Sequence, residues 1–553
     1  MEVMKGKLKD IQVFLLVLVA VLLLNWLGSS IFFRIDMTED DRYSLSPSTI
    51  RVVEDMKGEV EVEIFLHGDF PAQYKILEQS IEEKLQDLKA YAGGDLSYYF
   101  TDPFAITDKT QRTELLQSLQ QRGIVPISLN DSEEGKRVEK LIFPGAIVRF
   151  GQRELAVNFV KGMMMDGDNG KIQEAVQGIE YELVHSLKTI MQQKRKRVAF
   201  LLGHGELDQR QVQDLVANLS PNYDVGFFNL SVNPSIDSID AIVIAQPTQS
   251  FSPIDQYKID QFIMKGGKAL FFLDMVETRK DTSGMVGLPY HLKLEDLLFK
   301  YGIRINEDLI KDLYGAPVPV RVSGQYKLVP WGFNPVLSNF NQKHPITRNM
   351  GDVYGKNVGT IDTVFAPGVV KTPLMFTSSY VLKHSQPVVF SPEELRFEPR
   401  KEAYPTGDLA VSYLLEGSFK SLYAGRPLPA GADRSTYVDH IESGQVIVAS
   451  DGDLIANAID QQTGKPYQLG FDLVSRQQFA NKDFAMNCVN YLLDEDGVID
   501  LKMNVQKLRQ LDKFKVKEDR VFWQVTNVVA PILVIVLFGV VQFFLRKRKN
   551  TRF

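Results

Sequence analysis

Two long apolar runs stand out in the pattern of hydrophobic and polar positions, one near each end of the chain. The first lies within residues 11–33, and the second fills residues 521–545. About 20 consecutive apolar residues are enough for a helix to cross the hydrocarbon core of a bilayer. The pattern therefore predicts two membrane helices, with a large polar and mixed region between them.

Basic residues flank the outer end of each apolar run and predict its orientation. Lys5, Lys7 and Lys9 precede the first run, and Arg546–Lys549 follow the second. Loops rich in Lys and Arg are retained on the cytoplasmic side of a membrane. We therefore expect a cytoplasmic tip at residues 1–10 and a basic cytoplasmic tail at residues 546–553. The intervening residues 34–520 are then expected on the far side.

A cleaved signal peptide is the alternative interpretation of the first run. Gly28–Ser30 would then supply the small residues of a cleavage site. A signal peptide has an apolar region of only about 7–15 residues. The first run is longer, which favours a retained anchor.

Residues 34–170 show the order strand, helix, strand, helix, strand, strand, with Pro126 ahead of the final strands. That order resembles a thioredoxin-like domain. The loop after the first strand, His67–Pro71, contains no Cys-x-x-Cys motif. Thiol redox chemistry requires a sulfur nucleophile, so we expect a scaffold whose loops bind a partner. The predicted strands are Glu59–Leu66, Leu96–Phe100, Leu141–Phe150 and Glu154–Val160, with helices near 76–92 and 108–121.

Residues 171–196 predict a connecting helix, and residues 197–500 predict a second domain. Several short runs in this domain are apolar without alternation, which is typical of strands buried on both faces of a parallel sheet. Because such strands alternate with helical patterns, we expect a doubly wound α/β fold with an insertion at about 300–440. Residues 501–520 are then a linker. The apolar runs are Val198–Leu202, Tyr223–Leu230, Ala241–Ala245, Ala269–Asp274 and Gln445–Ala449.

Composition narrows the function classes. The chain has 63 Lys and Arg against 69 Asp and Glu, a formal charge of −6. This balance gives no electrostatic footprint for nucleic acid. Cys488 is the only cysteine, so no internal disulfide is possible. It lies in a helical pattern, which favours a buried and inert thiol.

Polar residues follow three of the predicted parallel strands. In an open parallel sheet the carboxyl ends of the strands face the binding crevice, so we expect these residues on one rim. A histidine with several carboxylates there would suit a metal or acid–base chemistry. The same residue types also form strand-to-helix turns and helix caps, and that interpretation is favoured. The candidate rim for a ligand or partner is Gly203, His204, Gly205, Glu206, Asp274, Asp451 and Asp453.

Common catalytic signatures are absent from the sequence. It contains no G-x-S-x-G, H-E-x-x-H or G-x-x-x-x-G-K-[ST] motif. The nearest phosphate-loop sequences, Gly266–Lys268 and Asn169–Lys171, lack the required spacing. We therefore assign no catalytic residue, metal or cofactor, and we expect ATP to be bound by another subunit.

The order of short motifs along the whole chain resembles the GldG family, the gliding-motility-associated auxiliary components of ABC transporters. The motifs between the two apolar runs are Arg34–Thr38, Tyr43–Pro47, Gly203–Glu206 and Asn490–Gly497. The resemblance implies a complex with a GldF-like permease and a separate GldA-like ATPase. It implies a bacterial inner-membrane location with a large periplasmic region. The second domain is similar to class I glutamine amidotransferases but has no cysteine at the nucleophile turn, which implies recognition rather than hydrolysis.

The leading hypothesis is therefore a non-enzymatic exporter subunit anchored among membrane lipids. A membrane-tethered hydrolase or metal enzyme is the second hypothesis, using His204, Glu206, Asp451 and Asp453. A structural protein that binds the cell envelope is the third. The sequence names neither the substrate, the direction of transport nor the stoichiometry.

Overall fold

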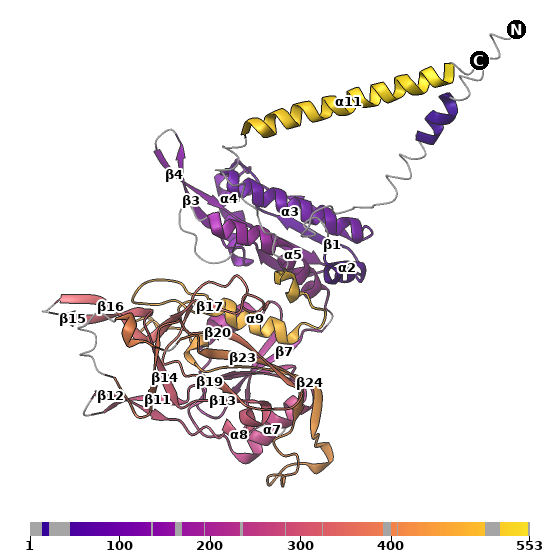
Figure 1. Ribbon diagram of the computed structural model, residues 1–553. Coiled ribbons are helices and arrows are strands. Elements are labelled where there is room, and N and C mark those ends of the chain that lie inside the picture. The colour runs from indigo at the N-terminus through magenta and orange to yellow at the C-terminus, as the bar shows by residue number, and fades with distance from the viewer. Residues whose placement is uncertain are drawn as a thin grey trace. The chain divides into compact units, whose positions relative to one another are not determined.

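Figure 1 shows the computed structural model, which describes residues 14–21, 45–133, 136–160, 169–192, 194–232, 236–281, 284–322, 325–390, 400–405, 407–503 and 520–550. The chain divides into two units. One comprises Met1–Ile35 and Ser44–Asn504, and the other comprises Asp36–Tyr43 and Val505–Phe553. All the sheets belong to the first unit, and the described part of the second unit is one long helix.

The first sheet has the strand order β2-β1-β5-β6. Strands β1 and β2 are parallel, whereas β5 is antiparallel to both β1 and β6. Alternation in β1 turns Val60, Val62 and Ile64 into the core. Helices α2, α3 and α5 contribute to this core, and α4 packs Leu119 against a smaller cluster with Ile147 of β5. The elements are α2 (Pro47–Glu54), β1 (Val60–Ile64), α3 (Ala72–Tyr91), β2 (Leu96–Phe100), α4 (Lys109–Gln121), β5 (Gly145–Phe150), β6 (Arg153–Asn158) and α5 (Asn169–Met191).

One prediction for this region is corrected by the structure. The strand predicted at Leu141–Phe150 is broken at Pro144, which has no N–H to donate. Its first part belongs to β4 (Lys136–Ile142), which forms a separate hairpin with β3 (Ile127–Glu133). Helix α5, predicted as a connection, also packs its apolar residues into the first core. Strands β5 and β6 form a hairpin whose turn contains Gly151, with φ 59°.

The second sheet has eight strands in the order β17-β20-β23-β24-β10-β9-β7-β8. The five strands predicted as parallel are parallel to one another. The other three join the sheet through antiparallel pairs, β23 with β24, β20 with β23 and β17 with β20. The sheet is therefore mixed, whereas the sequence predicted a parallel one. The strands are β7 (Arg197–Leu202), β8 (Asp224–Asn229), β9 (Ala241–Ala245), β10 (Lys268–Phe272), β17 (Asn339–Phe340), β20 (Val369–Phe376), β23 (Ala410–Lys420) and β24 (His440–Ala449).

Helices cover both faces of the second sheet. Residues of α6 and α9 share one core with the sheet, and residues of α7 and α8 share another. Ser252 caps α7 and Pro253 begins it, which fixes where the chain turns from loop to helix. Cys488 in α9 is fully buried, and burial raises the pKa of its thiol, as an inert core cysteine requires. The helices are α6 (Gln213–Leu219), α7 (Pro253–Met264), α8 (Glu295–Tyr301) and α9 (Asn481–Leu493), and the 3-10 helices are η2 (Lys401–Ala403), η3 (Arg434–Thr436), η4 (Asp453–Ile455) and η5 (Ile499–Met503).

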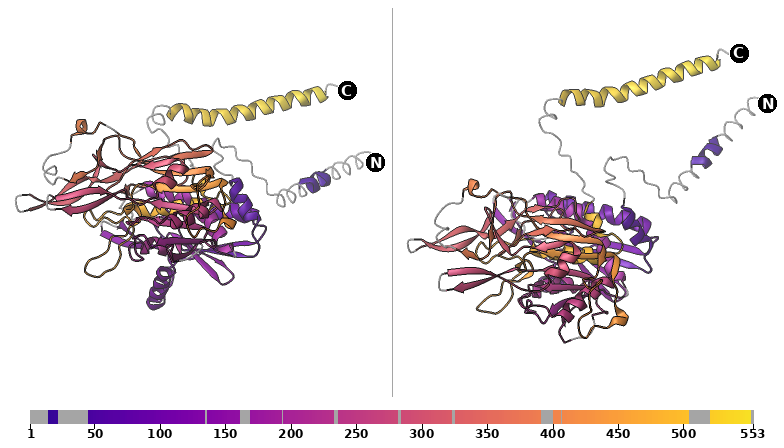
Figure 2. Two further views of the ribbon diagram at one scale, coloured as in Figure 1. Left: turned by 90° about the horizontal axis from the view of Figure 1, so that it is seen from below. Right: turned by 60° about the horizontal axis from the view of Figure 1, so that its bottom comes forward.

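The region predicted as an insertion at 300–440 completes the second sheet, because it supplies β17, β20 and β23. It also forms small sheets beside the main one, including hairpins that extend from the body of the unit (Figure 2). A satellite core joins the bases of these small sheets through Val276, Leu309, Phe333 and Phe390. The remaining strands are β11 (Val276–Asp281), β12 (Gly284–Pro289), β13 (Ile303–Ile305), β14 (Asp308–Asp312), β15 (Gly315–Val322), β16 (Gln325–Leu337), β18 (Val353–Tyr354), β19 (Ile361–Thr363), β21 (Val381–Ser385) and β22 (Val388–Phe390).

The second unit contains α11 (Arg520–Asn550). By length and composition its segment Val525–Phe544, with a mean hydropathy of 2.4 and none of it buried, is able to cross a membrane. It is the one such helix found among the described residues. Of the first predicted span, residues 14–21 are helical and the remainder lies outside the described residues. The predicted cytoplasmic tip and most of the 501–520 linker lie outside them as well.

Candidate functional site

The predicted rim residues follow β7, β10 and β24. These strands run in the same direction in the second sheet, so their carboxyl ends lie at one edge. The side-chain contacts divide the rim into two groups. One is centred on His204 and the other on Asp274 and Asp451.

His204 is buried between two carboxylates. Its Nδ1 lies 3.3 Å from Oε1 of Glu206, and its Nε2 lies 3.2 Å from Oδ2 of Asp255. The ring stacks on Phe251 with the centroids 3.8 Å apart. Only 3% of His204 is exposed. Both ring nitrogens are therefore occupied within the protein, and the imidazole is not presented to a ligand.

Asp255 joins the His204 group although the sequence analysis did not select it. Its Oδ2 accepts a hydrogen bond from Ser252 Oγ at 2.6 Å, and its own N–H donates to the same hydroxyl at 3.2 Å. Burial acts to raise the pKa of Asp255, but the Ser252 bond, Lys258 and His204 together lower it. A Ser-x-x-Asp capping pattern at the start of α7 was the signal that could have identified this residue.

The loop after β9 is hydrogen-bonded to the backbone of His204. The His204 carbonyl accepts hydrogen bonds from the N–H groups of Thr248 and Gln249, both at 2.9 Å. Gly205 has φ +72°, and a Cβ there would lie 2.1 Å from Thr248 Oγ1. Gly203 also has a positive φ, of 119°. The two glycines serve the tight turn, as the turn interpretation predicted.

Asp274 connects the ends of three neighbouring strands. Its Oδ2 accepts from Gln246 Nε2, and its Oδ1 accepts from the backbone N–H of Gly452, both at 2.7 Å. Gln246 follows β9 and has φ 51°, a left-handed conformation that is uncommon for a residue with a side chain. The carboxylate of Asp274 therefore fixes the loops that follow β9 and β24.

Asp451 and Asp453 fasten the loop that contains Lys356. Asp451 accepts N–H groups from Asp453 at 2.8 Å and from Lys356 at 2.9 Å. The Lys356 ammonium reaches Oδ1 of Asp453 at 3.1 Å. Burial and the negative charges of neighbouring carboxylates raise the pKa of both Asp274 and Asp451. Each of their oxygens already accepts an N–H from the protein, which is the pattern of a structural fastening.

Within the described residues, no group of three or more His, Cys, Asp or Glu side chains is arranged to hold a metal ion. The His204 group and the Asp274 group also share no hydrogen bond or ion pair among those the structure describes. The geometry therefore favours turn and capping roles over the alternative of acid–base or metal chemistry.

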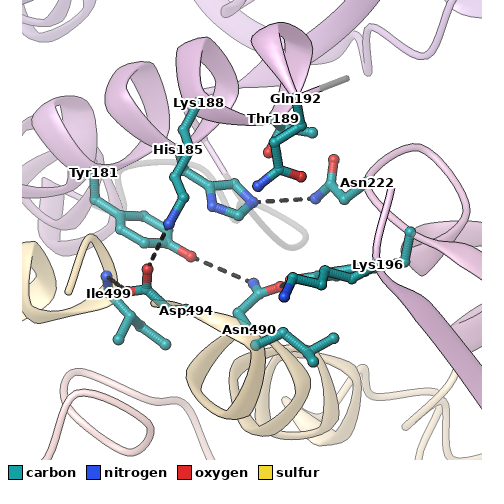
Figure 3. A pocket seen from close by; sticks show the side chains of 12 residues that line it. Tyr181, His185, Lys188, Thr189, Gln192, Lys196, Asn222, Asn490, Asp494 and Ile499 are labelled. Atoms are coloured by element: carbon teal, nitrogen blue, oxygen red, sulfur yellow. Dashed lines mark hydrogen bonds and ion pairs between the residues drawn. The ribbon is translucent and has the colours of Figure 1, made fainter. Parts of the chain in front are cut away.

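A polar pocket lies elsewhere, beside α5 (Figure 3). On one side it has a stripe of α5, and on the other it has the end of α9 and the turn before β8. The α5 residues recur at helical spacing, so their position on one face of the helix could have been read from the sequence. The sequence pattern was interpreted only as a connecting helix. The lining residues are Tyr181, His185, Lys188, Thr189, Gln192, Lys196, Asn222, Tyr223, Asn490, Leu493, Asp494 and Ile499.

Contacts across the pocket join α5 to the second domain. Lys188 Nζ lies 2.8 Å from Asp494 Oδ1, and a ring nitrogen of His185 lies 3.1 Å from Asn222 Nδ2. Asn490 donates to the Tyr181 hydroxyl at 3.3 Å. Burial acts to lower the pKa of Lys188, but the ion pairs with Asp494 and its neighbour Asp496 raise it. The pocket is thus a junction rich in paired polar groups.

Comparisons with known proteins bear on the two domains separately. Residues 195–488 match the ABC_transp_aux family, described as an ABC-type uncharacterized transport system, and residues 39–149 match DUF7088, a domain of unknown function. No curated protein matches the chain. Among solved structures, the mmIFT52 N-terminal domain is similar at 12% identity, covering 54% of this chain and 97% of that one, with a TM-score of 0.32. A likeness that weak says nothing about function. Because the first match spans more than half of the 553 residues, the chain belongs to the ABC_transp_aux family and is an auxiliary component of an ABC transport system.

Proposed function

We propose that this protein is a non-enzymatic auxiliary subunit of a gliding-motility-associated ABC transporter, similar to GldG. Its partners would be a GldF-like permease and a separate GldA-like ATPase. It would be anchored in the bacterial inner membrane by both apolar runs, with both termini cytoplasmic and its bulk in the periplasm. The observation that carries this proposal is the family match over residues 195–488. The apolar, unburied segment of α11 is compatible with the anchor.

The state of the rim supports a non-catalytic role. The His204 ring is buried with a carboxylate beside each nitrogen. Asp274 and Asp451 are also buried, and their oxygens accept N–H groups from the protein. A general base or metal ligand needs a free acceptor directed at a substrate or ion. In the rim these acceptors are hydrogen-bonded to neighbouring loops of the same protein instead.

The sheet topologies support the proposed domain organisation. Residues 34–170 would form a thioredoxin-like domain. The strand order β2-β1-β5-β6 and its mixture of parallel and antiparallel pairs support this assignment. Residues 197–500 would form a glutamine-amidotransferase-like domain. The five parallel strands and the helices on both faces of the sheet support this assignment. Both domains would serve recognition.

The direct test is purification of the tagged full chain from membranes in mild detergent. We expect the permease and the ATPase of an ABC transporter to copurify in a fixed ratio. A purification that recovers neither subunit would contradict the proposal. Hydrolytic activity or bound metal that is lost in the variant His204→Ala would favour the membrane-tethered enzyme instead, and sedimentation with cell wall would favour the envelope-binding protein.

A further inference from the structure

The hairpin of β15 and β16 is an arm that is fixed at its base and open to solvent along its outer part. Trp331 and Phe333 of β16 pack into the satellite core at the base. The outer part extends from the body of the unit, as both views in Figure 2 show. Beyond the base, Tyr326 is 75% exposed and Leu328 is 59% exposed.

Apolar side chains occupy both faces of the arm. In the antiparallel register, Pro319 lies opposite Leu328 and Pro317 lies opposite Pro330, which places these four on one face. The intervening pairs, such as Val318 with Val329, lie on the other face. A two-stranded hairpin is at best marginally stable alone in water. An arm with apolar residues on both faces is therefore suited to lie against another surface.

The outer edge of β15 is poorly suited to strand addition. Pro317 and Pro330 both lack an N–H, so this pair cannot be one of the hydrogen-bonded pairs of the ladder. The N–H positions of residues 317 and 319 therefore face the outer edge of β15, and proline removes both donors. Proline at an edge prevents pairing with a further strand. Pairing of a second copy or an extended peptide with the β15 edge is therefore disfavoured, and the exposed side chains on the two faces are the main surface for contact with a partner.

Insertion into lipid is disfavoured by the backbone. Among the residues that the structure describes, no strand pairs with the outward carbonyl groups along the outer arm. Open sheet edges do not occur within the hydrocarbon region of a bilayer, because no water is present there to hydrogen-bond the unpaired backbone groups. A protein surface with water at its rim leaves these carbonyls hydrated.

Charge specifies the partner further. Between Gly315 and Leu337 the only charged residues are Arg321 and Lys327, and there is no Asp or Glu. Two copies of the arm would bring like charges together. A complementary surface combines an apolar groove with carboxylates at its rim.

We infer that the β15–β16 arm docks on another protein subunit of the ABC transport system, in an apolar groove rimmed by Asp or Glu. The inference rests on the proposed function, because it takes the partner from the same complex. It adds the surface through which the partner is held and the chemistry of the partner's groove.

Photo-cross-linking in the full chain tests the arm. A photoreactive phenylalanine analogue replaces Tyr326, and in a matched control it replaces Phe365, which is 90% exposed but lies outside the arm. We expect the Tyr326 position to yield an adduct with a transporter subunit and the Phe365 position to yield none. Reversing the charges with Arg321→Glu and Lys327→Glu should reduce the adduct about tenfold or more, whereas Arg321→Lys should preserve it.

The outcomes separate the arm from the function. If the transporter subunits copurify but Tyr326 gives no more adduct than Phe365, the arm is not the docking surface and the proposed function stands. Adducts only with lipid, or only with a second copy of this chain, overturn the inference in the same way. If no transporter subunit copurifies, both proposals fail.

Discussion

The buried carboxylate of Asp274 predicts an unusual dependence of stability on pH. Its pKa is raised above the ordinary value of 3.8, first by burial and then by the charge of Asp453. Between the unfolded and folded pKa values, the folded chain holds a proton that the unfolded chain has released. The free energy of unfolding therefore falls as pH rises through this interval, by at most about 1.4 kcal/mol per pH unit for one group.

The variant Asp274→Asn removes this titration and keeps the side-chain shape. One of its two acceptors becomes an NH₂ group that faces a donor, so a constant loss of about 1–3 kcal/mol is expected at every pH. However, the free energy of unfolding of the variant no longer falls with rising pH as that of the parent does. Loss of the charge also relieves Asp451, whose pKa is raised by burial and by Asp274. The stability difference between variant and parent should therefore shift in favour of the variant by on the order of 2–4 kcal/mol from pH 5 to pH 8.

Thermal unfolding of the purified chain at pH 5, 6, 7 and 8 measures this shift. One kcal/mol corresponds to about 2–4 °C in Tm for domains of about 150–250 residues, so the Tm difference should change by about 5 °C or more. Asp208→Asn is the matched control, because hydrogen bonds from the N–H groups of Gln211 and Arg210 lower the pKa of Asp208. Its stabilising effect is lost only as pH falls toward the folded pKa, so its Tm difference should stay flat from pH 5 to pH 8. A flat difference for Asp274→Asn as well would refute the reasoning.

Three further predictions concern the turn, the core and the topology. Gly205→Ala should destabilise the chain by about 1–3 kcal/mol in chemical denaturation, more than Gly464→Ala, because both positions have a positive φ but only Gly205 has a side-chain oxygen 2.1 Å from the added Cβ. Phe484→Ala should cost about 3–5 kcal/mol in the same assay, since the ring is fully buried in the second sheet's core; a loss below about 1 kcal/mol would show that the site collapses. Gln249→Cys should react with a membrane-impermeant maleimide in cells whose outer membrane is opened, while the parent, with Cys488 buried, should not; protection of Gln249→Cys would contradict the periplasmic location.

The apolar pattern was sufficient for the five parallel strands of the second sheet. Ala241–Ala245 is buried at every position, and its unbroken apolar run predicted this. The antiparallel strands were not predicted, because β23 is only partly apolar and its partner β20 contains Pro373 and Lys371. Their pairing depends on contacts far apart in sequence, which local periodicity does not record.

The sequence predicted where the rim residues lie, but it did not predict which neighbours their side chains contact. Strand direction alone places His204 and Asp274 at the same edge. Whether the two side chains belong to one site depends on which neighbouring groups form hydrogen bonds with them. The neighbour of His204 is Asp255, at the start of α7, and the neighbour of Asp274 is Gln246, in the loop after β9. The sequence pattern does not specify how this helix and this loop approach the rim.

Helix α5 explains why the two sheets form one unit. Its apolar residues, such as Leu183 and Leu187, lie in the first core, and that core also includes Ile499 and Leu501 of η5, which follows α9. On its other side, Lys188 pairs with Asp494 at 2.8 Å. Separating the domains would expose part of the core and leave a partly buried ion pair without its partner, a loss of several kcal/mol. The described residues from 45 to 503 are therefore expected to move as one body.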